Sequence, residues 1–249
     1  MPVTDTELYI FKFSPILKEK LWGGTKLMDK LGKSSMEQQI GESWEISDVE
    51  GDCSIVQEGA LQGKTLRNLV ETYKDKLVGK KNYNRFGNKF PLLIKFIDAK
   101  KDLSVQLHPD DTIAQQKHDS FGKTEMWHIV QADQNAAIIV GFKDRITKAQ
   151  YQHHVQAKTI EDVLNRVEVK PGDTFFVYPG LIHAIGAGVL LAEIQQTSDV
   201  TYRIYDWDRK DKNGKTRELH QEEALEAIDF KTKDQYDICL LYTSDAADD

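Results

Sequence analysis

The sequence predicts a mainly β protein, built as a barrel or a sandwich with only a few helices. Short apolar runs of strand length follow one another at close intervals, separated by turn residues, which is typical of closed or two-layered β folds. Helical periodicity is confined to three segments. The chain has 249 residues, so one large β domain can bury a sizeable core.

The predicted strands lie mostly in the second and third quarters of the chain, at residues 91–99, 103–108, 125–130, 136–142, 167–170, 174–178, 189–195 and 201–207. We expect 125–130 and 136–142 to form a hairpin, because turn-forming residues separate them. We expect 167–170 and 174–178 to form a second pair, joined by a Pro-Gly-Asp turn.

Three helices are predicted. Apolar residues fall at helical spacing over 66–77, with Thr65 as a candidate N-cap. Thr159-Ile-Glu-Asp162 fits a capping box and opens a second apolar stripe that ends at Val167. Residues 221–230 form the third candidate.

Charge and composition restrict the class of protein. The formal net charge of −7 argues against nucleic acid or an anionic membrane as a general partner. No apolar run approaches the roughly 18–20 residues that span a bilayer, and the N-terminus lacks the features of a signal peptide. The two cysteines, Cys53 and Cys239, make neither a disulfide framework nor a thiolate metal site. A cytoplasmic protein is the simplest interpretation.

The most informative segment is Ser104-Val-Gln-Leu-His108. In a strand, alternate residues lie on the same face, so Ser104, Gln106 and His108 share one face while Val105 and Leu107 share the other. A face of hydroxyl, amide and imidazole groups indicates the wall of a polar pocket.

His183 and Glu125 are candidate partners for that pocket. His183 follows the turn Pro179-Gly180, where a lone histidine is more often structural. Together with His108 it becomes a candidate metal ligand, since imidazole is the commonest neutral ligand in proteins. Glu125 either completes a carboxylate and imidazole set or forms an exposed ion pair with Lys123 worth under ~1 kcal/mol.

These residues make a ligand set of nitrogen and oxygen without sulfur: Gln106, His108, Glu125 and His183. Such a set suits a divalent ion such as zinc and leaves a coordination position for substrate or water. Only a closed β barrel would bring strands so far apart in the sequence to one mouth.

Arg203 lies in an otherwise aromatic and β-branched strand, where arginine is rarely buried without a partner. If it points inward, it supplies a local cation for a phosphate or an oxyanion. If it points outward, it pairs with Asp206 or Asp208. The residues alone do not decide between these alternatives.

Several motifs resemble known families. Gly172-Asp, five residues, Pro-Gly, two residues and His183 is one residue off the usual spacing of the second cupin motif. In a wider comparison, the chain resembles the type I mannose-6-phosphate isomerases in their short bacterial form. The resemblance covers about residues 8 to 237 and rests on segments 13–27, 41–47, 104–111, 122–125, 178–186 and 193–209.

That resemblance implies a cupin-type, jelly-roll β barrel and a metal-dependent isomerase that interconverts mannose 6-phosphate and fructose 6-phosphate, with one Zn²⁺ per chain. It implies a sugar phosphate as the partner and a monomer or weak oligomer. The family's site residues correspond to metal ligands Gln106, His108, Glu125 and His183, a catalytic Arg203, and Ser104 and Lys123 at the substrate.

The implied chemistry abstracts a weakly acidic proton beside a carbonyl, through an enediol(ate). A divalent ion disperses the developing charge, and Arg203 adds a positive charge that is never lost by deprotonation. The proton carrier needs a base that functions near neutral pH. The neutral amine of Lys123 and a water on the metal both remain candidates.

We expect residues 1–210 to form the catalytic domain, with a helical insertion around 64–80. The resemblance implies a further β region that is incomplete here, so 211–238 would be the start of a truncated C-terminal region. Residues 239–249 continue no pattern, resemble a translated sequencing adapter and are expected to be a non-native tail.

Two other functions stay open: a non-catalytic metal-binding cupin that senses sugar phosphate, and an isomerase of another aldose. Lys123 and Arg203 discriminate between an enzyme and a sensor, because a sensor needs residues that bind the phosphate but needs no residue that transfers a proton.

Overall fold

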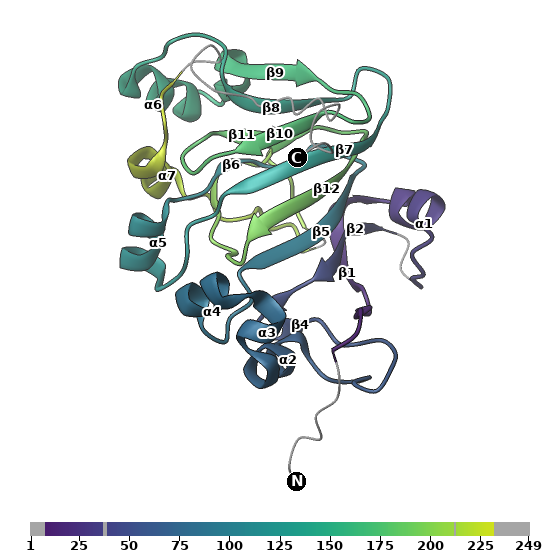
Figure 1. Ribbon diagram of the computed structural model, residues 1–249. Coiled ribbons are helices and arrows are strands. Elements are labelled where there is room, and N and C mark those ends of the chain that lie inside the picture. Colours follow the sequence, from purple (N-terminus) through teal and green to yellow (C-terminus); the bar gives the residue numbers. More distant parts are fainter. Residues whose placement is uncertain (1–7, 37–38, 212, 232–249) are drawn as a thin grey trace, which may run out of the picture.

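The computed structural model describes residues 8–36, 39–211 and 213–231. Two antiparallel β-sheets face each other, and helices lie around their edges and outer faces (Figure 1). The predicted tail at 239–249, Cys239 included, lies outside the described residues, as does the end of the expected C-terminal region.

The larger sheet has six strands, ordered β1 (Ile16–Gly24), β2 (Ile40–Ile46), β5 (Leu92–Ala99), β12 (Val189–Gln196), β7 (Glu125–Ala132) and β10 (Thr174–Val177). Along β5, residues two apart face the second sheet, among them Leu93, Lys95 and Ile97. Lys95 pairs in register with Glu193 of β12, so one row of this inner face is charged.

The smaller sheet has five strands, ordered β13 (Tyr202–Tyr205), β6 (Val105–Leu107), β11 (His183–Ile185), β8 (Ala137–Phe142) and β9 (Leu164–Glu168). The short strands β3 (Asp48–Val49) and β4 (Asp52–Cys53) form a separate ribbon. β6, which contains part of the predicted polar strand, lies between the edge strand β13 and β11.

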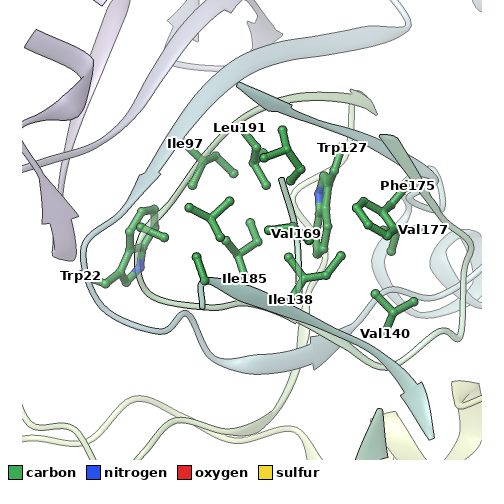
Figure 2. Packing of buried hydrophobic residues seen from close by; sticks show 14 of the residues in the cluster. Trp22, Ile97, Trp127, Ile138, Val140, Val169, Phe175, Val177, Ile185 and Leu191 are labelled. Carbon is green, nitrogen blue, oxygen red and sulfur yellow. The ribbon is translucent and has the colours of Figure 1, made fainter. Parts of the chain in front are cut away.

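Apolar side chains from both sheets fill one part of the space between them (Figure 2). Trp127 and Ile97 come from the larger sheet and Ile138 and Ile185 from the smaller one, and each is at most 3% exposed. This packing fixes the distance between the two sheets and therefore the shape of the polar end next to it.

Helices cover the outside. They are α1 (Lys26–Leu31), α2 (Leu66–Tyr73), α3 (Asp75–Val78), α4 (Lys80–Phe86), α5 (Asp111–His118), α6 (Lys148–Gln156) and α7 (Gln221–Ala227). Helices α6 and α7 contribute to an apolar cluster behind the smaller sheet. In that cluster Phe142 stacks on Phe230, with ring centroids 5.9 Å apart. No helix in the described ranges is long and apolar enough to cross a membrane.

The predicted helix over 66–77 is present but broken. Thr65 caps α2 as expected, with Asn68 completing a capping box. At Lys74 the backbone takes φ 52°, which ends α2 and starts α3 in a new direction. The helical region then continues through Phe86, beyond the expected insertion at 64–80.

Both predicted strand pairs are wrong. β7 pairs with β12 and β10, whereas β8 pairs with β11 and β9, so the turn at 133–135 carries the chain from one sheet to the other. The Pro-Gly-Asp turn likewise connects β9 to β10 across the sandwich. Alternation defines a strand's inner face but not its neighbour, and the neighbours here come from distant segments.

The helix predicted from Thr159 is also wrong. Ile160–Val163 forms one 3₁₀ turn, the Thr159 side chain makes no cap hydrogen bond, and Leu164 already begins β9. The apolar residues from Leu164 to Val167 belong to a strand on the edge of the smaller sheet, where β8 supplies hydrogen-bond partners that a local helix pattern does not anticipate.

Candidate active site

A cavity of about 210 Å³ opens between the sheets, at the polar end next to the apolar core. Its lining includes five residues singled out from the sequence: Ser104, Gln106, Lys123, His183 and Arg203. Val105 and Leu107 lie instead in the apolar cluster behind the smaller sheet. The predicted division of this strand into a polar and an apolar face is therefore present in the fold.

His108, Glu125 and His183 lie close together, and of the three only His183 is part of the cavity lining. One ligand atom from each lies within 4.8 Å of the others, and all three residues are buried. His108 Nε2 is 3.2 Å from Glu125 Oε1, and His183 Nε2 is 3.8 Å from Glu125 Oε2. His108 directly follows β6, Glu125 begins β7 and His183 begins β11.

A tight backbone contact joins the segments that carry His108 and Glu125. The Gly122 amide donates to Asp111 Oδ1 (2.9 Å), and the Lys123 amide donates to the Pro109 carbonyl (3.2 Å). A Cβ on Gly122 would lie 2.5 Å from the backbone of Asp110, which leaves room only for glycine. The glycine thus holds the Glu125 strand against the His108 loop.

The second ring nitrogen of each histidine fixes its orientation. His108 Nδ1 donates to the Val200 carbonyl (2.9 Å), and His183 Nδ1 donates to the Leu181 carbonyl (2.8 Å). A carbonyl only accepts, so the proton of a neutral ring is on Nδ1 and the lone pair is on Nε2. Both Nε2 lone pairs are therefore available next to Glu125.

Burial sets the charge states of this cluster. Burial and the charge of Lys123 lower the pKa of His108 to about 4, and burial lowers the pKa of His183. Burial also acts to raise the pKa of Glu125, but Lys123, His108 and His183 together outweigh it and the pKa lies well below the usual value. At neutral pH the cluster is two neutral imidazoles and one carboxylate, the donor states that metal ligation requires.

The donor atoms fit a divalent cation. His108 Nε2, His183 Nε2 and Glu125 Oε2 are buried without a hydrogen-bond partner in the described part of the chain, and Glu125 Oε1 lies 2.8 Å from the Lys123 ammonium. Orphaned buried groups of this kind are costly unless another group satisfies them. Gln106 lies directly opposite His183 in the β6–β11 pairing, and both residues line the cavity.

Ser104 links Gln106 to Arg203. Its hydroxyl donates to Gln106 Oε1 (3.1 Å) and accepts from Arg203 Nε (3.3 Å). Arg203 therefore points toward the cavity, and it pairs with neither Asp206 nor Asp208 as the outward alternative required. Its guanidinium also donates to the Glu218 carbonyl (3.1 Å).

Lys123 and Glu125 form an ion pair of 2.8 Å. The pair is buried, with side chains 7% and 1% exposed, so the alternative of an exposed surface pair is wrong. The Lys123 side chain reaches the cavity from the same strand end that supplies Glu125.

Sequence reasoning missed a second charged group in the cavity, centred on Lys95 and Glu193. Their side chains pair at 2.8 Å, and the indole nitrogen of Trp127 donates to Glu193 (2.9 Å). Burial acts to lower the pKa of Lys95, but the attraction of Glu193 and Glu42 raises it above its usual value. The signal was a lysine and a glutamate inside apolar strands, where charged residues are rarely buried unless paired.

Glu42 and Lys20 extend this charged row toward the opening, 3.4 Å apart. The Trp44 indole donates to Glu42 Oε2 (2.7 Å). Burial acts to raise the pKa of Glu42, but Lys95 and Lys20 outweigh it and lower the value. The wall made by the larger sheet therefore alternates fixed positive and negative charges.

Comparison with known proteins places this chain in a family. The model of the family described as phosphomannose isomerase type I, catalytic domain, matches residues 10–138. Mannose-6-phosphate isomerase ManA of Bacillus subtilis is 43% identical over 218 residues, which are 87% of this chain and 67% of that protein. A mannose-6-phosphate isomerase of Streptococcus mutans is 38% identical over 212 residues, 85% of this chain and 65% of that protein. The chain spans about two thirds of the length of these relatives.

Solved structures of mannose 6-phosphate isomerases are also similar to this chain. The mannose 6-phosphate isomerase of Bacillus subtilis has a TM-score of 0.84 at 40% identity, over 91% of this chain and 70% of that one. A phosphomannose isomerase variant from Salmonella typhimurium has a TM-score of 0.70 at 16% identity, over 90% and 75% of the two chains, and shows the fold alone. The predicted mainly β, cupin-type fold is confirmed. The chain belongs to the type I phosphomannose isomerase family, the enzymes that interconvert mannose 6-phosphate and fructose 6-phosphate.

Proposed function

We propose that this chain carries out the isomerisation of its family in the cavity between the two sheets, with the seven site residues named above. The observation that carries the proposal is the cluster of His108, Glu125 and His183, whose orphaned ligand atoms lie beside the cavity cations Lys123 and Arg203. A sugar phosphate is the substrate that the family implies.

Gln106, His108, Glu125 and His183 would hold one divalent ion, and zinc suits their nitrogen and oxygen donors. When bound, the ion would supply Lewis-acid polarisation of the substrate carbonyl. Val200 and Leu181 support the site from behind, because their carbonyls hold the two rings in the ligating tautomer.

Arg203 contributes a permanent positive charge next to the reacting end of the sugar. It lies opposite Gln106 in the β13–β6 pairing, and the Ser104 hydroxyl fixes its Nε. A prepositioned guanidinium stabilises an oxyanion more than a mobile one, since it does not reorganise as charge develops. Ser104 would also orient the sugar hydroxyls.

Lys123 is the proposed proton carrier: as the neutral amine it takes the proton from one carbon atom, and as the ammonium it returns the proton to the other. Its amine lines the cavity and lies 2.8 Å from Glu125, at the same end as the ligand cluster. Glu125 holds the amine in position through their 2.8 Å contact. We also propose a cytoplasmic location and a monomeric or weakly oligomeric state.

A coupled assay with mannose 6-phosphate tests the function. Purified chain is stripped with a chelator, verified metal-free by elemental analysis, and measured before and after zinc is restored. We expect activity only with metal. Unchanged activity in the verified metal-free protein would exclude the metal role, and binding of the sugar phosphate without turnover would support the alternative of a sensor. Turnover of another aldose phosphate in preference to mannose 6-phosphate would identify a different isomerase.

A further inference from the structure

Beyond the seven site residues, two more arginines gather at the edge of the cavity around one carboxylate. Arg217 binds Asp206 with two nitrogens, Nη2 to Oδ1 at 2.6 Å and Nε to Oδ2 at 2.8 Å. Arg209 Nη2 contacts the same Oδ1. The Asp206 side chain is 6% exposed, and Arg217 lines the cavity. A bidentate pair of this kind fixes the plane of the guanidinium.

The backbone that carries Asp206 is strained. Trp207 and Asp208 have φ values of 57° and 50°, a region that side chains other than glycine rarely adopt. Two contacts hold the turn in place: the Trp207 indole donates to the Leu103 carbonyl (2.9 Å), and Arg209 donates to the Asp102 carbonyl. Strain that persists under such constraint is concentrated at functional sites.

The segment after Arg217 runs across Arg203. The Glu218 carbonyl accepts from Arg203 Nη1 (3.1 Å), and the His220 amide donates to the Arg203 carbonyl (2.7 Å). Arg203 and Arg217 therefore occupy adjacent places in the cavity wall, and burial together with the charge of Arg217 lowers the pKa of Arg203.

Charge is unbalanced at this edge. The three lysines of the lining each pair with a carboxylate: Lys20 with Glu42, Lys95 with Glu193 and Lys123 with Glu125. Asp206, however, serves both Arg209 and Arg217, so one positive charge is left over.

Arg203 adds a second positive charge, because it has no carboxylate within ion-pair distance in the described ranges. Two acidic residues lie nearby, Asp199 in the cavity lining and Glu218, and both are exposed to solvent. A phosphate monoester carries about −1.5 to −2 charge at pH 7, which matches the surplus.

We propose that Arg217 binds the phosphate group of the substrate, and that Asp206 is the positioning residue that orients it. The inference rests on the proposed function for the placement of the sugar. The ligand cluster and Gln106 define the end where C1 and C2 react, and Arg203 lies opposite Gln106. The phosphate is at the other end of the six-carbon chain, and Arg217 is the neighbouring cation of the cavity wall, in the cluster that carries the surplus charge.

The test combines a change in the protein with a change in the ligand. Metal-free chain is titrated calorimetrically with mannose 6-phosphate and with mannose, for the parent and for Arg217→Gln. We expect the parent to prefer the phosphorylated sugar, and the variant to lose about ten- to hundredfold of that preference, with little change for mannose. Arg217→Lys keeps the positive charge but loses the bidentate geometry of the guanidinium. Its preference for the phosphorylated sugar should lie between those of the parent and of Arg217→Gln.

Arg145→Gln is the matched control, since Arg145 is an exposed arginine outside the cavity. It should retain the parent's preference. Thermal unfolding verifies that each variant is folded. A parent without preference for the phosphorylated sugar, or an Arg217→Gln variant that keeps it, would overturn the proposal. The titration needs no turnover, so an inactive parent that still shows the preference would count against the proposed function and leave the phosphate assignment supported.

Asp206→Asn separates positioning from contact. It leaves Arg217 in the chain but removes the bidentate anchor, so the preference for mannose 6-phosphate should fall less than in Arg217→Gln. Measured with zinc in the coupled assay, KM should rise more than kcat falls in both variants. An unchanged KM in Asp206→Asn would show that Asp206 does not position Arg217.

Discussion

The imidazole rings of His108 and His183 lie with centroids 4.8 Å apart and turn the same nitrogen, Nε2, toward Glu125. Their other nitrogens donate to backbone carbonyls, so neither ring is free to reverse without losing a buried hydrogen bond. Two imidazole rings in the same orientation, with a carboxylate between them, form a cluster that could hold a cation.

Replacement of His183 or of Glu125 should abolish metal binding. We expect parent chain to bind one zinc ion, and His183→Ala and Glu125→Gln to bind less than a tenth of that amount after dialysis, because a set of four ligands loses one. Elemental analysis of the dialysed proteins measures the content. His128→Ala is the control, since His128 lies on the same strand as Glu125 but is exposed and bonds to Thr174. Full zinc content in His183→Ala would remove His183 from the ligand set.

Replacement of Lys123 should stop proton transfer and leave the metal in place. We expect Lys123→Gln to lower kcat about 10²- to 10⁴-fold, the usual contribution of an acid–base group. Exchange of the substrate C2 proton with deuterated water, followed by NMR, should fall in parallel. Lys101→Gln, at an exposed lysine, should behave as the parent. If Lys123→Gln slows turnover but not exchange, another group carries the proton.

Asp206 should make stability depend on pH in the acid range. Burial acts to raise its pKa, but the hydrogen bonds from Arg217 and Arg209 outweigh it and lower the value. The unfolded chain then holds the proton more tightly, so the stabilisation is complete above about pH 4 and is lost as pH falls through the lower folded pKa.

Asp206→Asn should therefore reduce the free energy of unfolding by about 1–3 kcal/mol at pH 7. The difference from the parent should shrink below about pH 4. Thermal unfolding followed by circular dichroism from pH 3 to 7 measures it. Asp208→Asn is the control, because Asp208 pairs with Lys158 at the surface, where both side chains are 63% exposed, and exposed pairs contribute little. A constant difference down to pH 3 would contradict the assigned role of Asp206.

Local pattern predicted most strands because burial on one face imposes a period of two, as in Leu92–Ala99 and Val189–Gln196. The same pattern did not predict which strands pair with one another. Strands β7 and β8 are consecutive and joined by a turn, yet they lie in different sheets. At Leu164 the neighbouring strand β8 prevailed over a helical stripe, since tertiary hydrogen bonds exceed local propensity.

The site was partly visible in the sequence. Ser104, Gln106 and His108 alternate with apolar residues, and family motifs pointed to Glu125, His183, Lys123 and Arg203. Nothing local distinguished an inward from an outward Arg203. The bond from Arg203 to Ser104 and the packing of residues 217–220 across β13 show which way the side chain points. Arg217 has no strand pattern around it, so its place in the cavity wall followed from the fold alone.

The sequence by itself determined the class of fold, the polar face at 104–108 and the membership in an isomerase family, because these depend on period and motif. Tertiary structure decided which distant residues meet. Closure of two sheets brings His108, Glu125 and His183 within 4.8 Å, pairs Lys95 with Glu193, and leaves Asp206 shared by two arginines. The reason is physical: distances between strands are set by packing across the sandwich, and no local stretch of the chain contains that information.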